Sequence, residues 1–236
     1  MTRTIDLNAD AGEDPAALVD GREERLVRAV TSVNAATGGH AGDPRTLDAL
    51  ARLCATHNTA LNAHPSYPDR AGFGRATMTI TRDALLASLR DQLALADDAA
   101  RAHAITVSRV KPHGALYHDA ANDRDVARTL ADACARPTEI VLPPTATTRE
   151  VFAQAGHTIV PEGFADRGYT DAGALLPRTE PGALIDNPDD AATQALALAL
   201  SQRVRTLCVH SDTPNALAIA RRVRERLAHA GWTVAR

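Results

Sequence analysis

The chain alternates short apolar stretches with longer helical ones along its whole length, and this alternation constrains the fold more than any other feature. Seven stretches have the length and the β-branched or apolar composition of buried strands. Helices are predicted between them, and strands that alternate with helices belong to a parallel sheet. The predicted strands are residues 4–7, 32–34, 60–63, 105–110, 139–142, 158–161 and 206–209.

The stretches between these strands favour amphipathic helices. Asp43 is expected to cap the helix that begins at Pro44, and Thr81 to cap the long helix after it. Because no linker or repeat interrupts the alternation, residues 1–236 are expected to form one domain. The helices are predicted at residues 23–30, 44–57, 82–103, 123–135, 145–155, 189–202 and 215–230.

The composition excludes several classes of protein. Hydrophobic residues make up 44% of the chain but aromatic residues only 3%, so Ala, Leu and Val must fill the core. The formal net charge is −3 and the basic residues are scattered, which argues against a nucleic-acid-binding surface. No stretch approaches the roughly 20 apolar residues of a membrane helix. The expected partners are small molecules or proteins.

The cysteines and the N-terminal residues indicate the cellular compartment in which the protein is expected. Cys54, Cys134 and Cys208 are odd in number, widely spaced and form no C-x-x-C pair, which fits a reducing environment. Cys208 lies in an apolar run and is expected to be a core residue. The first residues lack the apolar stretch of a signal peptide. A cytoplasmic location is therefore predicted.

Polar residues collect directly after the predicted strands. In Lys111-Pro112-His113-Gly114-Ala115-Leu116-Tyr117-His118, the proline and the glycine end a strand and leave a cation, imidazoles and a phenol at its mouth. Active sites of α/β folds lie at this end of the strands. An open sheet would spread such positions over roughly 30 Å, at about 4.8 Å per strand, whereas a barrel gathers them. We therefore predict a seven-stranded (β/α) barrel with one mouth lined by Asp10, His40, His64, Lys111, Glu162 and His210.

None of the short motifs typical of nucleotide or zinc sites is present: the sequence has no phosphate-binding G-x-x-x-x-G-K-[ST] loop, no H-E-x-x-H and no C-x-x-C. The ordered set of polar segments is more specific, and it resembles the LamB/YcsF family from about residue 4 to the last helix. The segments are Asn8-Ala9-Asp10-x-Gly12-Glu13, His40-Ala41-Gly42-Asp43-Pro44, Ala63-His64-Pro65, Gly72-Phe73-Gly74-Arg75, Lys111-Pro112-His113-Gly114-Ala115-Leu116-Tyr117, Glu162-Gly163-Phe164-Ala165-Asp166-Arg167 and His210-x-Asp212-Thr213-Pro214.

The resemblance implies a barrel like those of glycoside hydrolases and polysaccharide deacetylases. It also implies the A subunit of an ATP-dependent 5-oxoprolinase, which hydrolyses the lactam of 5-oxo-L-proline to L-glutamate with ATP cleavage, together with the B and C subunits. The sequence departs from the family pattern at Thr37, where the family has cysteine, at Gly39, where it has an aromatic residue, and at Ser211, where it usually has glycine. These departures bear on the substrate.

The residues fit this chemistry. A lactam is an unreactive amide, and phosphorylation of its oxygen by ATP would supply a leaving group. Ring opening then needs a base for water, donors for the oxyanion and an acid for the ring nitrogen. Without a phosphate-binding loop, ATP is expected to be handled by the partner subunits. The predicted catalytic residues are Asp10, His40, His64, Lys111, His113, Glu162 and His210, and the predicted substrate-binding residues are Asn8, Glu13, Asn34, Arg75, Tyr117, Arg178 and Asp212.

Some roles stay open. Asp212 alternatively caps the last helix, and Tyr117, Asp166 and Arg167 are expected to order loops or support other site residues. Lys111 is expected to meet an anionic group without supporting the core; alternatively it pairs with a carboxylate and holds its loop.

Two other functions remain possible from the sequence. One is a metal-dependent deacetylase or amidohydrolase in which Asp10, His40 and His64 bind a divalent ion, since one carboxylate and two imidazoles suit zinc. The other is a non-catalytic protein that binds the substrate for a partner enzyme.

Overall fold

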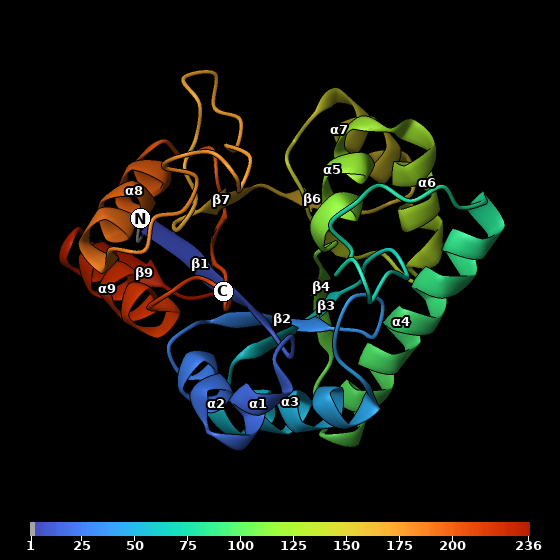
Figure 1. Ribbon diagram of the computed structural model, residues 1–236, viewed down its shortest axis with the longest axis horizontal. Coiled ribbons are helices and arrows are strands. Elements are labelled where there is room, and N and C mark those ends of the chain that lie inside the picture. The colour runs from blue at the N-terminus through green and yellow to red at the C-terminus, as the bar shows by residue number, and fades with distance from the viewer. Residues whose placement is uncertain (1–2) are drawn as a thin grey trace.

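The computed structural model describes residues 3–236 as a ring of parallel strands with helices around its outside (Figure 1). The strands are β1 (Arg3–Ala11), β2 (Ser32–Ala36), β3 (Ala60–His64), β4 (Val107–Val110), β5 (Glu139–Val141), β6 (Thr158–Val160), β7 (Glu162–Phe164), β8 (Thr206–Val209) and β9 (Trp232–Val234). The helices are α1 (Pro15–Val19), α2 (Arg22–Val27), α3 (Pro44–His57), α4 (Arg82–Ala102), α5 (Gly114–Asn122), α6 (Arg124–Ala133), α7 (Ala146–Gln154), α8 (Pro188–Leu200) and α9 (Ala216–His229).

The sheet runs β6-β5-β4-β3-β2-β1-β8-β7, with every pairing parallel, and β9 adds to the start of β1. The ring is nearly closed by a single run of chain, Thr158–Phe164, which Pro161 divides into β6 and β7. The first half of this run pairs with β5 and the second half with β8. The predicted α/β barrel is thus confirmed, but the predicted number of seven strands is wrong, because residues 162–164, which were expected to follow the sixth strand, form an additional strand, β7, after the bend at Pro161.

The structure corrects several predicted boundaries. β1 continues through Ala11 instead of ending at Leu7, so Asn8 and Asp10 lie on the strand and not after it. The predicted loop after Lys111 contains α5, and three short elements, α1, β7 and β9, were not predicted. The caps at Asp43 and Thr81 are confirmed, since each side chain accepts a hydrogen bond from the first turn of its helix.

The strands carry apolar side chains toward the helices and polar side chains toward the interior of the ring. On β1, Leu7 and Ala9 are fully buried under the helices, whereas Asp6 contacts Arg109 of β4 across the ring and Asn8 contacts Asn34 of the neighbouring strand β2. This reverses the common pattern of an apolar barrel interior. The hydrophobic core therefore lies between the strands and the helices, where small Ala, Leu and Val side chains pack.

This core is one cluster that extends from Ile5 to Leu227, which supports the prediction that residues 1–236 form one domain; Met1 and Thr2 of that predicted range lie outside the described residues. Among residues 3–236, the helices lack the combination of length and apolar character that crossing a membrane requires.

Asp6 ties four strands together at the floor of the ring. Its carboxylate accepts hydrogen bonds from Thr31 at 2.6 Å, from Ser32 at 3.0 Å and from Thr206 at 2.6 Å. Arg109, on the far side of the ring, donates to it at 2.7 Å, and both side chains are almost completely buried. Because buried donors that lose their acceptor pay the full cost of desolvation, this carboxylate should be essential for the fold.

We therefore predict that Asp6→Ala lowers the free energy of unfolding by about 3–5 kcal/mol, the cost of breaking a buried pair by removing one partner. Asp98→Ala, which removes a carboxylate paired with Arg101 on the surface of α4, should change it by less than about 0.5 kcal/mol. Urea denaturation measures both. A loss below about 1 kcal/mol for Asp6→Ala would show that the floor of the ring does not depend on this charge.

Candidate active site

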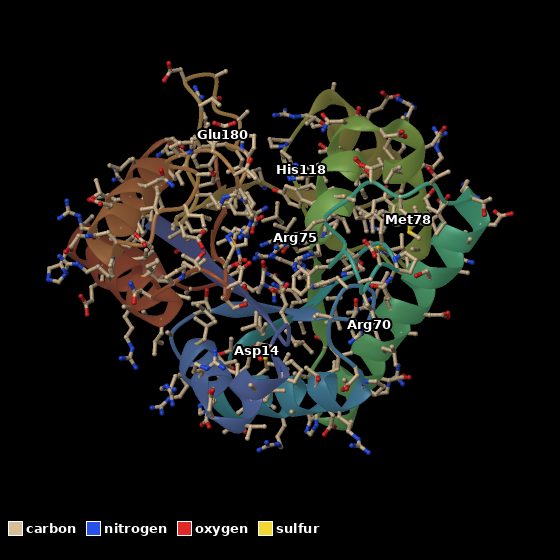
Figure 2. All side chains as sticks on the ribbon, viewed as in Figure 1. Asp14, Arg70, Arg75, Met78, His118 and Glu180 are labelled. Atoms are coloured by element: carbon tan, nitrogen blue, oxygen red, sulfur yellow. The ribbon has the colours of Figure 1, made fainter. Side chains whose placement is uncertain are left out.

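A cavity of about 370 Å³ opens at the carboxyl ends of the strands. Figure 2 shows Arg75 over the middle of the ring and His118 beside it, and both line this cavity. Gly114 lets the loop that carries Phe73, Gly74 and Arg75 come close, because its φ is +55° and a Cβ at this position would clash with the carbonyl oxygen of Gly74.

The six residues predicted to share one mouth all lie at this end of the ring. Asp10, His64, Lys111 and His210 line the cavity directly, together with the predicted residues Arg75, His113, Tyr117 and Arg178. Glu162 and His40 lie behind this wall, where Glu162 contacts Lys111 and His40 contacts Glu13. Glu13 and Asp212 line a neighbouring cavity of about 900 Å³. The cavity walls thus bring together residues from both ends of the sequence.

Lys111, the only lysine of the chain, lies inside the ring and not at an open loop mouth. Its Nζ is 3.1 Å from Asp10 Oδ1, 3.0 Å from Glu162 Oε1 and 3.0 Å from Cys208 Sγ. Burial alone would lower the pKa of this ammonium, but the Asp10 carboxylate, followed by Cys208 and Glu162, holds the pKa well above its usual value. Lys111 is therefore a buried, charged residue that pairs with carboxylates, as in the alternative that the sequence left open, and it does not lie at an open loop mouth.

The two carboxylates beside Lys111 differ in their environment. Burial would raise the pKa of Asp10, but Lys111 and then His64 hold it well below the usual range, so Asp10 is ionised. For Glu162, burial raises the pKa more than Lys111 lowers it. Its Oε2 atom is buried and has no hydrogen-bond partner among residues 3–236. Glu162 is therefore the carboxyl of this pair that more readily holds a proton.

Three asparagines orient Asp10. Asn62 donates to Asn34 at 3.0 Å, and Asn34 donates to Asn8 at 2.7 Å and to Asp10 at 2.9 Å. Asn8 in turn donates to Glu162 at 3.0 Å. Asn8 and Asn34, predicted to bind substrate, thus hold the two carboxylates in place from beneath. Asn62 was not predicted, although it occupies the same inward position on β3 as Asn34 does on β2.

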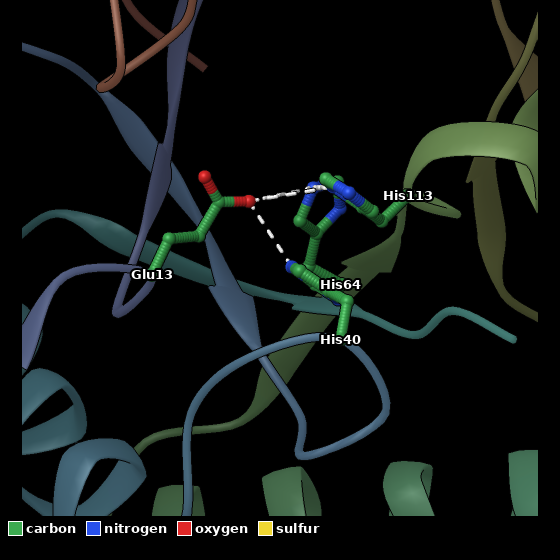
Figure 3. Close-up of side chains that lie close together, drawn as sticks. All are labelled: Glu13, His40, His64 and His113. Atoms are coloured by element: carbon green, nitrogen blue, oxygen red, sulfur yellow. Dashed lines mark hydrogen bonds and ion pairs between the residues drawn. The ribbon is translucent and has the colours of Figure 1, made fainter. Parts of the chain in front are cut away.

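Glu13 and three histidines form a cluster beside the Lys111 network (Figure 3). Glu13 Oε1 lies 3.1 Å from His40 Nε2 and 3.3 Å from His113 Nδ1. Burial would raise the pKa of Glu13, but its close contacts with His113 and His40 hold it far below the usual range. Burial lowers the pKa of His64 to about 3, so this ring is neutral. Glu13, predicted only to bind substrate, is the acidic centre of the cluster.

His210 is oriented by Asp166. The imidazole Nδ1 lies 2.9 Å from Asp166 Oδ1, and because a carboxylate only accepts, Nδ1 carries the proton and Nε2 is left free. Asp166 is fully buried and also accepts from the His210 backbone at 2.8 Å and from Thr213 at 2.6 Å. Burial lowers the pKa of His210, but Asp166 raises it above its usual value. Asp166 therefore positions His210, in line with its predicted supporting role.

The outer wall of the cavity carries guanidinium groups. Arg75 and Arg178 both pair with Asp212, at 2.8 and 3.1 Å, so Asp212 holds two cations at the mouth and does not cap α9, whose N-cap is Asn215. Tyr117 lies deeper, and burial, followed by the Glu162 charge, raises the pKa of its phenol well above its usual value. The phenol therefore keeps its hydrogen at neutral pH.

Cys208 is the site residue that sequence reasoning assigned to the core. It is fully buried, as predicted, but it faces the interior of the ring, where Lys111 lies. The signal in the sequence was its spacing, because Thr206 and Cys208 alternate along β8 on one face and His210 follows with the same spacing directly after the strand. The same spacing applies to Asp6, Asn8 and Asp10 on β1.

Two groups of side chains in the described residues have donor atoms close enough to bind one metal ion. The predicted ligands fall into different groups, because His40 and His64 lie with Glu13 and His113, whereas Asp10 lies with Cys208 and His210. In the second group, the Lys111 ammonium already lies against both Asp10 and Cys208. The second group is thus already neutralised by a protein cation.

We predict that Lys111→Met lowers the free energy of unfolding by about 3–5 kcal/mol, because it leaves Asp10 and Glu162 without their buried counter-charge. Arg101→Met, which removes a surface cation of α4, serves as the control and should change it by less than about 0.5 kcal/mol. Urea denaturation at pH 7 measures both variants. Equal stabilities of Lys111→Met and the wild type would contradict a structural role for this lysine.

One protein family matches almost the whole chain. The model of the LamB/YcsF family covers residues 5–236. A protein of Methylococcus capsulatus, named as the A subunit of 5-oxoprolinase, is 42% identical over 250 residues, covering 100% of this chain and 96% of the relative. A protein of the same name from Thermus thermophilus is 38% identical, with 98% of each chain covered.

The solved structure of a lactam utilization protein from Thermus thermophilus superposes with a TM-score of 0.89 at 36% identity, and the match covers 98% of this chain and 99% of that protein. The similarity in sequence and in fold therefore extends over nearly the entire length of this chain and of its relatives. The chain belongs to the LamB/YcsF family.

Proposed function

We propose that this chain is the A subunit of an ATP-dependent 5-oxoprolinase, a hydrolase that opens the lactam of 5-oxo-L-proline to give L-glutamate. The observation that carries the proposal is its similarity, at about 40% identity and over nearly full length on both sides, to proteins that bear this name. The related solved structure is named a lactam utilization protein, which points to the same class of cyclic amide.

The cavity supports a small, anionic, cyclic substrate. Its volume of about 370 Å³ lies at the lower end of the range of small-molecule sites, about 300–1,000 Å³. Phe164 and Pro112 give it apolar walls for a ring. Arg75 and Arg178 supply guanidinium groups that match a carboxylate. A lactam that carries one carboxylate has this combination of surfaces.

The proton transfers are assigned to the imidazole of His210. Asp166 fixes its Nδ1–H, so Nε2 is available to take a proton from water and later to return it to the ring nitrogen. The phenol of Tyr117 is a donor for an oxygen that gains negative charge. These assignments leave Lys111 and Asp10 to keep the floor of the cavity charged and rigid.

ATP and partner proteins complete the proposal. The relatives are named as one lettered component of 5-oxoprolinase, which indicates a complex of several subunits, and we assign the others as the B and C subunits. Since the sequence has no phosphate-binding loop, phosphorylation of the lactam is assigned to these partners. The three cysteines are free thiols, which supports a cytoplasmic location.

The first test is reconstitution. The purified chain alone should release no glutamate from 5-oxoproline and ATP, whereas co-expression with the genes adjacent to its own should give ATP-dependent release. Robust turnover by the isolated chain would return the ATP site to these residues. A complex that binds 5-oxoproline but never releases glutamate would favour the alternative of a non-catalytic, substrate-binding role.

The second test concerns the guanidinium groups. In the reconstituted complex, the double variant Arg75→Gln/Arg178→Gln should raise KM for 5-oxoproline about 10- to 150-fold, the effect of losing charged hydrogen bonds worth roughly 1.5–3 kcal/mol. The value of kcat should change less, because these residues lie away from the scissile bond. Arg101→Gln is the matched control. An unchanged KM would remove the two arginines from the substrate site.

A further inference from the structure

The hydrogen bonds of the cluster around Glu13 fix where the protons of two histidines lie. His64 Nδ1 is 2.6 Å from the carbonyl oxygen of Lys111, and His113 Nε2 is 3.0 Å from the carbonyl oxygen of Phe73. A carbonyl oxygen only accepts, so these two nitrogens carry hydrogen. In a neutral ring the other nitrogen then has a lone pair, which leaves His64 Nε2 and His113 Nδ1 as acceptors.

These two lone pairs point at each other and at a carboxylate. His64 Nε2 and His113 Nδ1 are 3.1 Å apart, and Glu13 Oε1 lies 3.3 Å from His113 Nδ1 and 3.8 Å from His64 Nε2 (Figure 3). All three side chains are at most one-tenth exposed, so water does not separate them. Three buried acceptors at such distances repel each other unless a cation lies among them. That cation is either an additional proton on His113 or a metal ion.

The triangle of acceptors has the dimensions of one face of a metal site. Zinc binds imidazole nitrogen and carboxylate oxygen at about 2.0–2.1 Å, and at tetrahedral angles this places ligand atoms about 3.3 Å apart. The observed sides of 3.1, 3.3 and 3.8 Å bracket this value. A set of two imidazoles and one carboxylate is typical of catalytic zinc sites, which keep a fourth position open.

Each of the three side chains also has the support that metal ligands require. The far nitrogens of His64 and His113 donate to backbone carbonyls, which fixes both rings. Glu13 is held by His40, whose Nε2 is 3.1 Å away and carries the proton because a carboxylate only accepts. The Nδ1 atom of His40 is buried without a partner in the described part of the chain. His40 stacks on His113 with the rings 3.6 Å apart and parallel, so both cannot direct lone pairs at one point.

We infer that Glu13 Oε1, His64 Nε2 and His113 Nδ1 bind a divalent transition-metal ion of the zinc class, and that His40 positions Glu13. His64 and His113 line the smaller cavity, so the open coordination position faces it. Magnesium is disfavoured, because it requires oxygen ligands in near-octahedral geometry. This ligand set differs from the predicted one, since Asp10 is bound to Lys111. The inference does not depend on the proposed function.

The test uses the metal alone. The full-length chain is freed of metal with a chelator and titrated with Co²⁺, whose visible spectrum reports coordination geometry, and Zn²⁺ is then added to displace it. We expect one Co²⁺ per chain with a tetrahedral spectrum, displaced by Zn²⁺ but not by excess Mg²⁺. Absence of Co²⁺ and Zn²⁺ binding, or displacement by Mg²⁺, would overturn the inference, and in the first case a proton on His113 would be the cation.

The Co²⁺ affinities of single-residue variants test which side chains bind the metal ion. Glu13→Gln and His113→Gln should each weaken Co²⁺ affinity more than about 100-fold, whereas His40→Gln should weaken it about 10- to 100-fold, as expected of a side chain that supports a ligand. His118→Gln, on the wall of the same cavity, should retain wild-type affinity. Equal affinity of Glu13→Gln and the wild type would overturn the assignment, as would loss of binding in His118→Gln.

A control separates ligand loss from misfolding. Glu13→Gln keeps the size of the side chain, so circular dichroism should show a folded protein without metal. Zn²⁺ should raise the melting temperature of the wild type, because a ligand that binds only the native state stabilises it. It should not raise that of Glu13→Gln. An equal rise in both proteins would place the ion elsewhere and overturn the proposed site.

Discussion

The ammonium group of Lys111 between Asp10 and Glu162 is the interaction on which the rest of the structure depends. It joins β1 and β7 to the end of β4 across the interior of the ring. In so dry a place the Asp10 carboxylate would have no counter-charge without it. The interior of the ring is filled with hydrogen-bonded polar groups. Asparagines lie beneath the two carboxyl groups, Asp6 pairs with Arg109 at the floor, and the cavity lies above them.

The sequence predicted the strands well where apolar residues dominate, as in β8, and less well where polar residues alternate with apolar ones. β1 was predicted to end at Leu7 because Asn8 and Asp10 looked like loop residues, whereas they are the inward half of a strand. The spacing of Asp6, Asn8 and Asp10 contains this information. The pairing of Lys111 with Glu162 does not follow from any local pattern, because 50 residues and the bend at Pro161 separate them along the chain.

The site has two functional sides that share one floor. On one side, His210, which Asp166 positions, lines the cavity together with the arginines at the mouth. On the other side, Glu13, His64 and His113 surround a space suited to a cation. The sequence indicated most of these residues by their positions after strands, but not how they divide. Whether a residue belongs to the His210 side or to the Glu13 side depends on where its loop lies relative to Lys111. The position of each loop is set by the closed ring of strands and not by the local sequence.

The most direct measurement of the central claim is the titration of Lys111 itself. Because the chain has only one lysine, selective ¹³C labelling of lysine gives a single Cε signal in an NMR spectrum. We predict that this signal keeps the chemical shift of a charged ammonium well above the usual lysine pKa of about 10.4, until the protein unfolds. A midpoint at or below that value in the folded protein would show that Lys111 is not held between Asp10 and Glu162.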